Sequence, residues 1–332
     1  MPAKRFLGLL LIPAALALGG CQKLVLLHPA GLVAQEQSHL MIVSTIILLS
    51  IIVPVLIAVA IVAWKYRASN KKARYDAKWD HSPVLELFVW AWPVLIILAV
   101  GALSWIGTHQ LDPYRPLTDV AKGEPVPANV KPLQVEVVAL QWQWLFIYPQ
   151  YGVASINELA APINRPITFK ITSLDGMDSF FIPALAGQIY AMPEMQTQLH
   201  GVINKVGVYK GMSANYSGAG FTDMRFKFYG MTKDSFNGWV AKVKASPKDL
   251  DRATYEELIK PVRNGPVQYF GTTQKGLFNR IVNRCVDPAN VCKSTLMARD
   301  AKTGLNADKK NAMGGMSMPA GKAADTVPAT AH

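Results

Sequence analysis

The sequence predicts a membrane-anchored α+β protein, in which a hairpin of two transmembrane helices precedes a β-domain with a helical C-terminal extension. Two long uncharged apolar runs lie in the first third of the 332-residue chain. Short runs rich in β-branched and aromatic residues follow, and Pro, Gly and Asn clusters separate them. Helical spacing of apolar residues returns near residue 235. Together these patterns place the helices before and after a domain built of strands.

The chain begins with the features of a bacterial signal peptide. Lys4 and Arg5 precede the uncharged run Phe6–Leu18, which is too short to span a bilayer. The residues Leu18-Gly19-Gly20-Cys21 resemble a lipoprotein box. This resemblance implies that residues 1–20 are removed and that Cys21 carries lipid at the head of segment 21–39. A plain signal peptide with an incidental cysteine is the alternative.

Two uncharged runs, residues 40–64 and 87–108, predict the membrane-spanning helices. They hold 25 and 22 residues, and at ~1.5 Å per residue both cross a hydrocarbon core of ~30 Å. The loop between them, residues 65–86, carries six Lys or Arg, whereas residues 28–39 carry none. The positive-inside rule therefore places the loop in the cytoplasm and both flanks outside, which agrees with lipid on Cys21.

Residues 113–232 have the pattern of a β-domain, either a sandwich or a barrel. Val135–Tyr148 is rich in β-branched and aromatic residues, and Ile167–Ser173 and Met224–Gly230 alternate apolar with polar side chains. Residues 233–294 form the helical, aromatic-rich extension. Its first predicted helix places four apolar residues on one face: Phe236, Trp239, Val240 and Val243.

Residues 295–332 have a low-complexity composition of Gly, Ala, Met and Pro, which predicts disorder. Met313, Met316 and Met318 have a spacing that soft copper(I) ligands use, and the alternative is that they bind nothing.

The residue inventory of the β-domain excludes several kinds of site. Only one histidine, His200, lies inside it, whereas a cupredoxin-type copper site needs two imidazoles and a thiolate. The chain has no glycine-rich phosphate loop followed by Lys and no Gly-x-Ser-x-Gly elbow. From residue 113 onward it holds 25 Lys or Arg against 17 Asp or Glu, a net charge of 25 − 17 = +8. Because this basic part lies outside the membrane, we expect no nucleic-acid partner.

Cys285 and Cys292 lie seven residues apart, with Asp287-Pro288 between them as turn residues. Outside the cytoplasm thiols oxidise, so these two residues predict a disulfide. A zinc site or redox chemistry is the alternative.

Three motifs resemble subunit II of the haem–copper terminal oxidases: QWQWLFIYP (Gln141–Pro149), TSLDGMDSFFIP (Thr172–Pro183) and the loop Gly211–Met224. The similarity covers about residues 40–282 and implies that the outer domain is a cupredoxin-like β-sandwich. In the cytochrome c oxidase branch, six positions of these motifs hold a copper centre. Here five of the six are replaced, and the positions hold Asp178, Ser213, Asn215, Ser217, Phe221 and Met224.

Phe cannot bind copper, and hydroxyl groups cannot replace bridging thiolates. We therefore predict that this loop keeps its shape and binds no metal. Three further stretches resemble subunit II of the cytochrome bo-type ubiquinol oxidases, which lack that copper centre: Ser179–His200, Ser213–Phe221 and Val267–Val282.

The resemblance implies a complex that oxidises ubiquinol, reduces oxygen to water and moves protons outward. Haems and copper would lie in the large subunit I, and further small membrane subunits would complete the complex. This chain would hold no cofactor and no catalytic residue, and would cap and brace the large subunit. Cytochrome c is usually basic, so a basic domain predicts that it is not a partner.

Two acidic residues are candidates for proton entry. Asp112, after the second apolar run, matches a carboxylate that lies at the mouth of a proton pathway in related subunits. The predicted topology places Asp112 outside, whereas Glu86 lies at the cytoplasmic start of the same helix, so Glu86 has the better position. Either acid can instead be an ordinary helix-end charge. Trp142 and Trp144, which lie where the copper-containing branch routes electrons, are interpreted as packing and interface residues.

Three other functions remain open at this point. They are a lipoprotein that delivers copper through its Met-rich tail, a copper-containing cytochrome c oxidase subunit II, and a free-standing membrane-anchored binding module.

Overall fold

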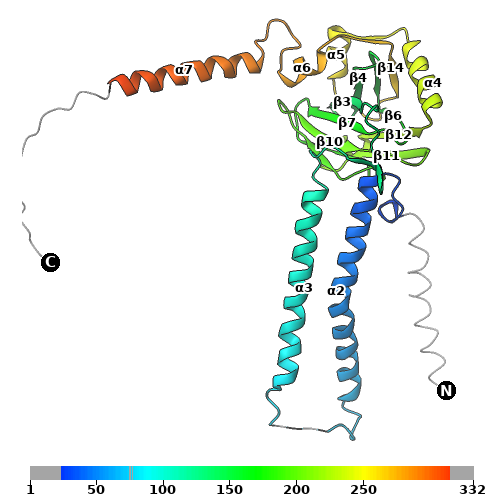
Figure 1. Cartoon of the computed structure of the whole chain (residues 1–332), viewed down its shortest axis with the longest axis vertical. Helices are drawn as coiled ribbons and strands as arrows, with labels where there is room; N and C mark the ends of the chain where they lie inside the picture. Colours follow the sequence, from blue (N-terminus) through cyan, green and yellow to red (C-terminus); the bar gives the residue numbers. More distant parts are fainter. Residues whose placement is uncertain (1–23, 75, 77, 315–332) are drawn as a thin grey trace, which may run out of the picture.

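The structure is a computed structural model, and it describes residues 24–314 apart from 75 and 77. The signal peptide, Cys21, Met316 and Met318 lie outside the described residues. Two long helices run side by side away from a β-domain, and a shorter helix extends from the far side of that domain (Figure 1). The predicted order of a helical hairpin, a β-domain and a partly helical extension is confirmed.

The hairpin consists of α2 (Leu32–Lys65) and α3 (Pro83–Gln110), both long and apolar enough to cross a membrane. The helices are longer than the uncharged runs that predicted them. The first turn of α2 contacts the β-domain, because the amide of Ala34 donates to the carbonyl of Leu185 over 3.2 Å. Just before the helix, the amides of Ala30 and Gly31 donate to the carbonyl of Ala184 over 3.0 and 2.9 Å. Gly31 also forms a β-bridge with Ile203. The domain is therefore fixed to the hairpin through the chain just before α2.

Two sheets form a sandwich. The six-stranded sheet has the order β10 (Thr197–Gly201), β7 (Ile167–Ser173), β3 (Leu133–Ala139), β4 (Trp144–Tyr148), β5 (Val153–Ile156) and β14 (Gln268–Phe270). The five-stranded sheet has the order β6 (Glu158–Pro162), β12 (Arg225–Met231), β11 (Gly207–Ser213), β8 (Asp178–Phe181) and β9 (Ile189–Ala191). A smaller ribbon pairs β1 (Asp119–Ala121) with β2 (Glu124–Pro125). Only β3–β7 and β6–β12 pair in parallel within the two large sheets.

Val135–Tyr148 forms two strands, β3 and β4, rather than one. A tight connection over residues 140–143 reverses the chain, and Trp142 there has a left-handed φ of 65°. The composition predicts strand but not this turn, because the connection lacks Gly, Pro and Asn.

The core between the sheets is aromatic. The rings of Phe180 and Phe226 stack at 5.5 Å, and Trp144 lies edge-on to both. Gly211 pairs with Phe226 across β11 and β12, and a Cβ at Gly211 would lie 2.0 Å from the Phe226 ring. Glycine is required there because the ring occupies the space of a side chain.

The extension covers the outer face of the six-stranded sheet. It contains α4 (Lys233–Lys244), α5 (Arg252–Leu258), α6 (Leu277–Val282) and the short parallel pair β13 (Asp249–Leu250) and β15 (Thr272–Thr273). The apolar residues of α5, α6 and β13 form a second core with β4 and β5, whose residues are buried on both faces of the sheet, whereas those of α4 join the core between the sheets. The prediction of a helical extension did not include β14, which adds an edge strand next to β5.

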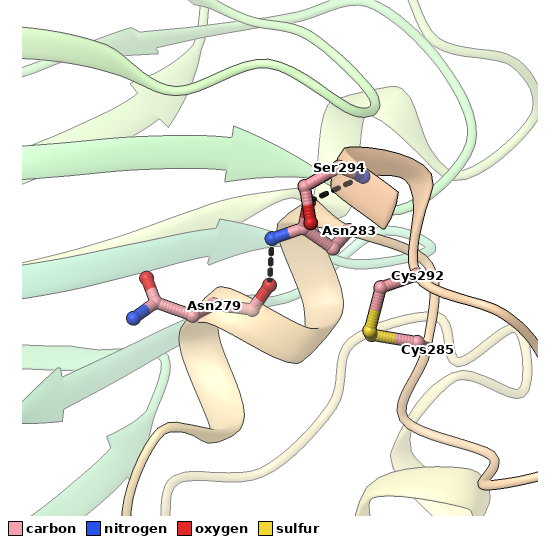
Figure 2. Close-up of a disulfide and its surroundings, with 5 residues drawn as sticks. All are labelled: Asn279, Asn283, Cys285, Cys292 and Ser294. Carbon is pink, nitrogen blue, oxygen red and sulfur yellow. Dashed lines mark hydrogen bonds between the residues drawn. A yellow bond between two sulfur atoms is a disulfide. The ribbon is translucent and has the colours of Figure 1, made fainter. Parts of the chain in front are cut away.

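Cys285 and Cys292 form a disulfide, with Cα atoms 4.8 Å apart. Figure 2 shows this bond beside the connection between α6 and α7 (Lys293–Gly314). Asn283 joins the two helices there, because its amide donates to the Asn279 carbonyl over 2.8 Å and its side-chain oxygen accepts from the Ser294 amide over 3.3 Å. Outside this loop, Arg284 and Lys293 both pair with Glu194.

We expect replacement of both Cys285 and Cys292 by Ser to lower the free energy of unfolding by about 2.5 kcal/mol, because a short closed loop no longer restricts the unfolded chain. Thermal unfolding of the purified protein, with and without reductant, measures this. Reductant should lower the unfolding temperature of the wild type and leave that of the double variant unchanged. Equal sensitivity of both proteins would contradict the prediction.

The prediction of disorder from residue 295 differs from the structure, in which α7 continues to Gly314. Its residues 294–303 are all exposed. The segment is rich in Ala, Lys, Leu and Met, which favour helix without any packing partner. Low complexity was therefore a poor guide to backbone conformation over residues 295–314, and residues 315–332 of the predicted tail lie outside the described part of the chain.

Candidate functional site

The positions that would hold copper in the related branch converge at one end of the sandwich. Asp178 opens β8, Ser213 ends β11, and these strands are neighbours in the five-stranded sheet. The Ser213 hydroxyl donates to Asp178 Oδ1 over 3.3 Å, and Ser217 Oγ lies 3.9 Å from the sulfur of Met224. Met224 is 1% exposed. Four of the six positions thus lie together although up to 46 residues separate them in sequence.

Trp142 holds the loop that carries these residues. Its indole N–H donates to the Ser217 carbonyl over 2.9 Å. The ring lies flat against two glycines: a Cβ on Gly220 would approach it to 2.2 Å, and Gly218 has a φ of 98°. The left-handed backbone of Trp142 aims the indole across the loop. Local packing therefore fixes a shape that a metal ion fixes in other proteins.

Asn215 and Phe221 complete the set but turn to other partners. The Asn215 amide donates to the carbonyl of Met177 over 2.8 Å, and Phe221 packs against Tyr216 with ring centroids 5.7 Å apart. A cavity of about 400 Å³ opens beside Asp178, between Trp142, Met177 and Tyr216. Of the six positions, only Asp178 places a carboxyl group in the lining of this cavity. The lining contains no imidazole and no thiolate. Within residues 24–303 no cluster of three or more His, Cys, Asp or Glu has a metal-binding arrangement.

Asp178 is the one ionisable group among the six. It is 5% exposed, and burial raises the pKa of its carboxyl above the ordinary value of 3.8, although the hydroxyls of Ser217 and Ser213 favour the ionised form. An imidazole in the same place would be a metal ligand, whereas this carboxyl is a buried acid held by two serines.

Replacing Asp178 by Asn should change the pH dependence of stability. Because the pKa is raised on folding, protonated Asp178 favours the folded state at low pH, and this contribution is lost as pH rises from 3.8 through the folded pKa. The variant lacks this titration. The difference in unfolding free energy, variant minus wild type, should therefore grow with pH across that window and then level off. Denaturant titrations at several pH values measure it, and a constant difference would contradict the prediction.

Trp144 lies in the core between the two sheets, where it is fully buried against Phe180 and Phe226. Its indole nitrogen has no hydrogen-bond partner among the described residues. Trp142 and Trp144 therefore occupy different environments: the first fixes the loop, and the second fills the core.

The two candidate proton-entry acids lie at opposite ends of α3. Glu86 is exposed in the first turn, far from the β-domain, whereas Asp112 follows the last turn beside it. The Asp112 carboxyl accepts from the Tyr114 amide over 2.9 Å. The two acids are therefore separated by the length of α3, and only Asp112 lies beside the β-domain.

A polar cavity that the sequence does not predict lies between the hairpin and the β-domain. It has a volume of about 360 Å³ and is lined by Glu36, Asp112, Arg115 and His200, among others. The Nε2 atom of His200 is buried there without a partner among the described residues, and burial lowers the pKa of the ring. No local signal points to this cavity, because its lining comes from four separate segments of the chain.

Comparison with known proteins agrees with this geometry. The family model for the cytochrome c oxidase subunit II periplasmic domain matches residues 152–228, and the model for the COX aromatic-rich motif matches residues 244–289. The β-sandwich is thus the cupredoxin-like domain that was expected, and the second match covers most of the extension.

Relatives match over most of the chain. The cytochrome bo(3) ubiquinol oxidase subunit 2 of Pseudomonas putida is 47% identical, covering 84% of this chain and 86% of that one. The ubiquinol oxidase subunit 2 of Acetobacter aceti is 46% identical, covering 86% and 90%. The solved periplasmic domain of cytochrome oxidase subunit II from Bradyrhizobium japonicum has 24% identity and a TM-score of 0.32, covering 35% of this chain and 95% of that one.

Two spanning helices and a periplasmic domain of this kind fit a protein of the inner membrane. Three observations indicate one family: the order of the elements, the convergent loop, and alignments with these relatives that cover more than four fifths of the sequence. This chain belongs to the family of cytochrome bo-type ubiquinol oxidase subunit 2, a branch of the haem–copper terminal oxidases.

Proposed function

We propose that this chain is the subunit of a proton-translocating ubiquinol oxidase that carries no redox centre of its own. One observation supports this above all: the site where related subunits hold copper retains its loop, but presents Asp178, two serine hydroxyls and Met224. Hydroxyl and carboxyl groups bind copper ions poorly compared with thiolate and imidazole groups. Electrons from ubiquinol would then enter the large subunit directly.

The structural role of the chain is to brace and cap that large subunit. The side chains of α2 and α3 are largely exposed along their apolar length, so the hairpin has apolar surface for both lipid and neighbouring helices. The haems and the copper would belong to the large haem–copper subunit, and further small membrane subunits would complete the complex. Lipid on Cys21 would add a second anchor on the periplasmic side.

Metal analysis of the complex, purified through a tag on this chain, tests the proposal. We expect haem, a copper content that the large subunit accounts for, and ubiquinol oxidation that inhibitors of the oxygen site block. A matched variant carries Asp178→His, Ser213→Cys, Asn215→Glu, Ser217→Cys and Phe221→His, which restores the ligand set beside Met224. It should gain about two copper ions per chain, because the positions already converge.

This variant is the positive control, because its copper content shows that metal analysis can detect copper bound at this site. Extra copper in the wild-type complex, equal to that in the variant, would overturn the assignment of a metal-free subunit. Purification of the wild-type chain without haem would overturn the assignment to an oxidase complex.

Glu86 is the proposed proton-entry residue, and Asp112 is the weaker candidate because it lies beside the periplasmic domain. Replacing Glu86 by Gln should lower turnover and proton pumping severalfold, since the amide cannot exchange protons. Asp112→Asn should leave both rates within error of the wild type. Proton release from vesicles during oxygen consumption measures this, and unchanged rates in Glu86→Gln would remove Glu86 as a candidate.

A further inference from the structure

The outer face of the five-stranded sheet carries a row of cations with apolar residues between them. Consecutive cross-strand pairs on this face are Val208 with Tyr229, Lys210 with Lys227, and Met212 with Arg225. The opposite face of the same strands is buried in the sandwich. We call the exposed set the basic face, and it consists of Lys205, Val206, Val208, Lys210, Arg225 and Lys227.

The charges of the basic face are not neutralised within the described part of the chain. Lys210 and Lys227 lie directly opposite each other, an arrangement of like charges that destabilises an isolated sheet. None of the four cations forms an ion pair with a carboxylate of residues 24–303. Val206 and Val208 between them are 61% and 62% exposed. A surface of this kind fits an anionic, partly apolar partner.

The basic face lies on the side of the domain from which the hairpin leaves. β11 lies directly above the start of α2 in Figure 1. The Lys205 ammonium group donates to the carbonyl of Pro29 over 3.3 Å, which joins the face to the chain that leads into α2. The face is therefore turned toward the periplasmic surface of the membrane that the hairpin crosses.

The length of α2 sets the height of this face. The uncharged run begins at Leu40, so about eight residues of α2, or ~12 Å, stand above the hydrocarbon core. A head-group layer is ~5–8 Å thick on each side, so the underside of the domain lies ~4–7 Å above its outer boundary, a gap that lysine and arginine side chains can span. The short helix η2 (Val25–Leu27) lies next to α2 at this level, and with Leu24 it exposes four consecutive apolar side chains.

We propose that the basic face, together with η2, binds the head groups of anionic phospholipids in the periplasmic leaflet. Lysine and arginine stems lie along apolar surface while their charged ends reach phosphate, and the exposed valines lie between these cations. The contact fixes the tilt of the β-domain relative to the membrane. It is independent of whether the subunit carries copper.

The test uses the intact complex with Val208→Cys, reconstituted in nanodiscs of phosphatidylcholine or of phosphatidylcholine with phosphatidylglycerol. A membrane-impermeant maleimide should label Val208→Cys at least about fivefold more slowly with the anionic lipid. Val267→Cys is the matched control, because Val267 is also exposed but precedes β14 at the far side of the domain. Its labelling rate should be equal in both nanodiscs.

Charge reversal gives the second arm. Lys210→Glu with Lys227→Glu should restore fast labelling of Val208→Cys in the anionic nanodiscs. The same number of reversals on the extension, Lys260→Glu with Lys275→Glu, should leave labelling slow. Fast labelling in both lipids overturns the proposal. Slow labelling that does not depend on lipid, and persists in detergent, also overturns it, because a neighbouring subunit then covers the face.

Discussion

Replacing Gly211 by valine is expected to lower the free energy of unfolding of the β-domain by at least about 3 kcal/mol, the upper end for overpacking a rigid core. A Cβ at this position would lie 2.0 Å from the ring of Phe226. That ring cannot move aside, because it stacks on Phe180 and contacts Trp144 and Phe146. Domains of this kind have only about 5–15 kcal/mol of stability, so we expect little assembled oxidase.

Gly238 provides the matched control. It lies within α4, and a Cβ there would meet nothing within 4 Å. Gly238→Ala should therefore raise stability by about 0.5–1 kcal/mol, because alanine loses less backbone entropy in a helix. The yield of purified complex and its thermal unfolding measure both variants. Wild-type yield and unfolding temperature for Gly211→Val would show that the Phe226 ring does not fix this strand pair.

Replacing Glu158 by alanine is expected to destabilise the chain by about 3 kcal/mol, because buried donors lose their acceptor. Glu158 is 8% exposed, and its Oε1 accepts from the indole of Trp239 over 2.8 Å and from the hydroxyl of Tyr269 over 2.6 Å. These partners lie on α4 and β14. One side chain thus joins two elements of the extension to β6 of the sandwich.

Glu158→Gln keeps an acceptor oxygen in the same place and should lose less than half as much stability. At this domain size 3 kcal/mol corresponds to a fall of about 6–12 °C in the unfolding temperature. Limited proteolysis adds a local measure, because loss of the Glu158 contacts should expose the connection between β12 and α4 first. Equal unfolding temperatures for the alanine and glutamine variants would show that the two hydrogen bonds contribute little.

Packing and hydrogen bonds within the chain fix the shape of the convergent loop. In this chain the loop is fixed by the Trp142 indole on Ser217 and by close approach of that ring to Gly220. A hydrogen bond joins Asp178 and Ser213 in the interior of the loop. Side chains of the chain itself therefore hold this loop in shape.

The sequence by itself determined the features that depend on the identity and spacing of near neighbours. The length of the two uncharged runs determined the hairpin, and the charges of residues 65–78 predict its direction in the membrane. The residues at 178, 213, 217 and 221 determined which copper ligands are absent, because ligand chemistry belongs to each side chain. The helical spacing of Phe236, Trp239, Val240 and Val243 likewise indicated the face of α4 that is buried.

Only the tertiary structure decided which distant residues meet. It placed β14 beside β5, 112 residues earlier in the chain, and it joined Glu158 to Trp239 across 81 residues. It also gave Trp142 its left-handed backbone and put Gly211 beneath Phe226. The physical reason is that a periodic pattern tells which face of a strand or helix is buried, whereas the partner on that face depends on how all the layers pack together.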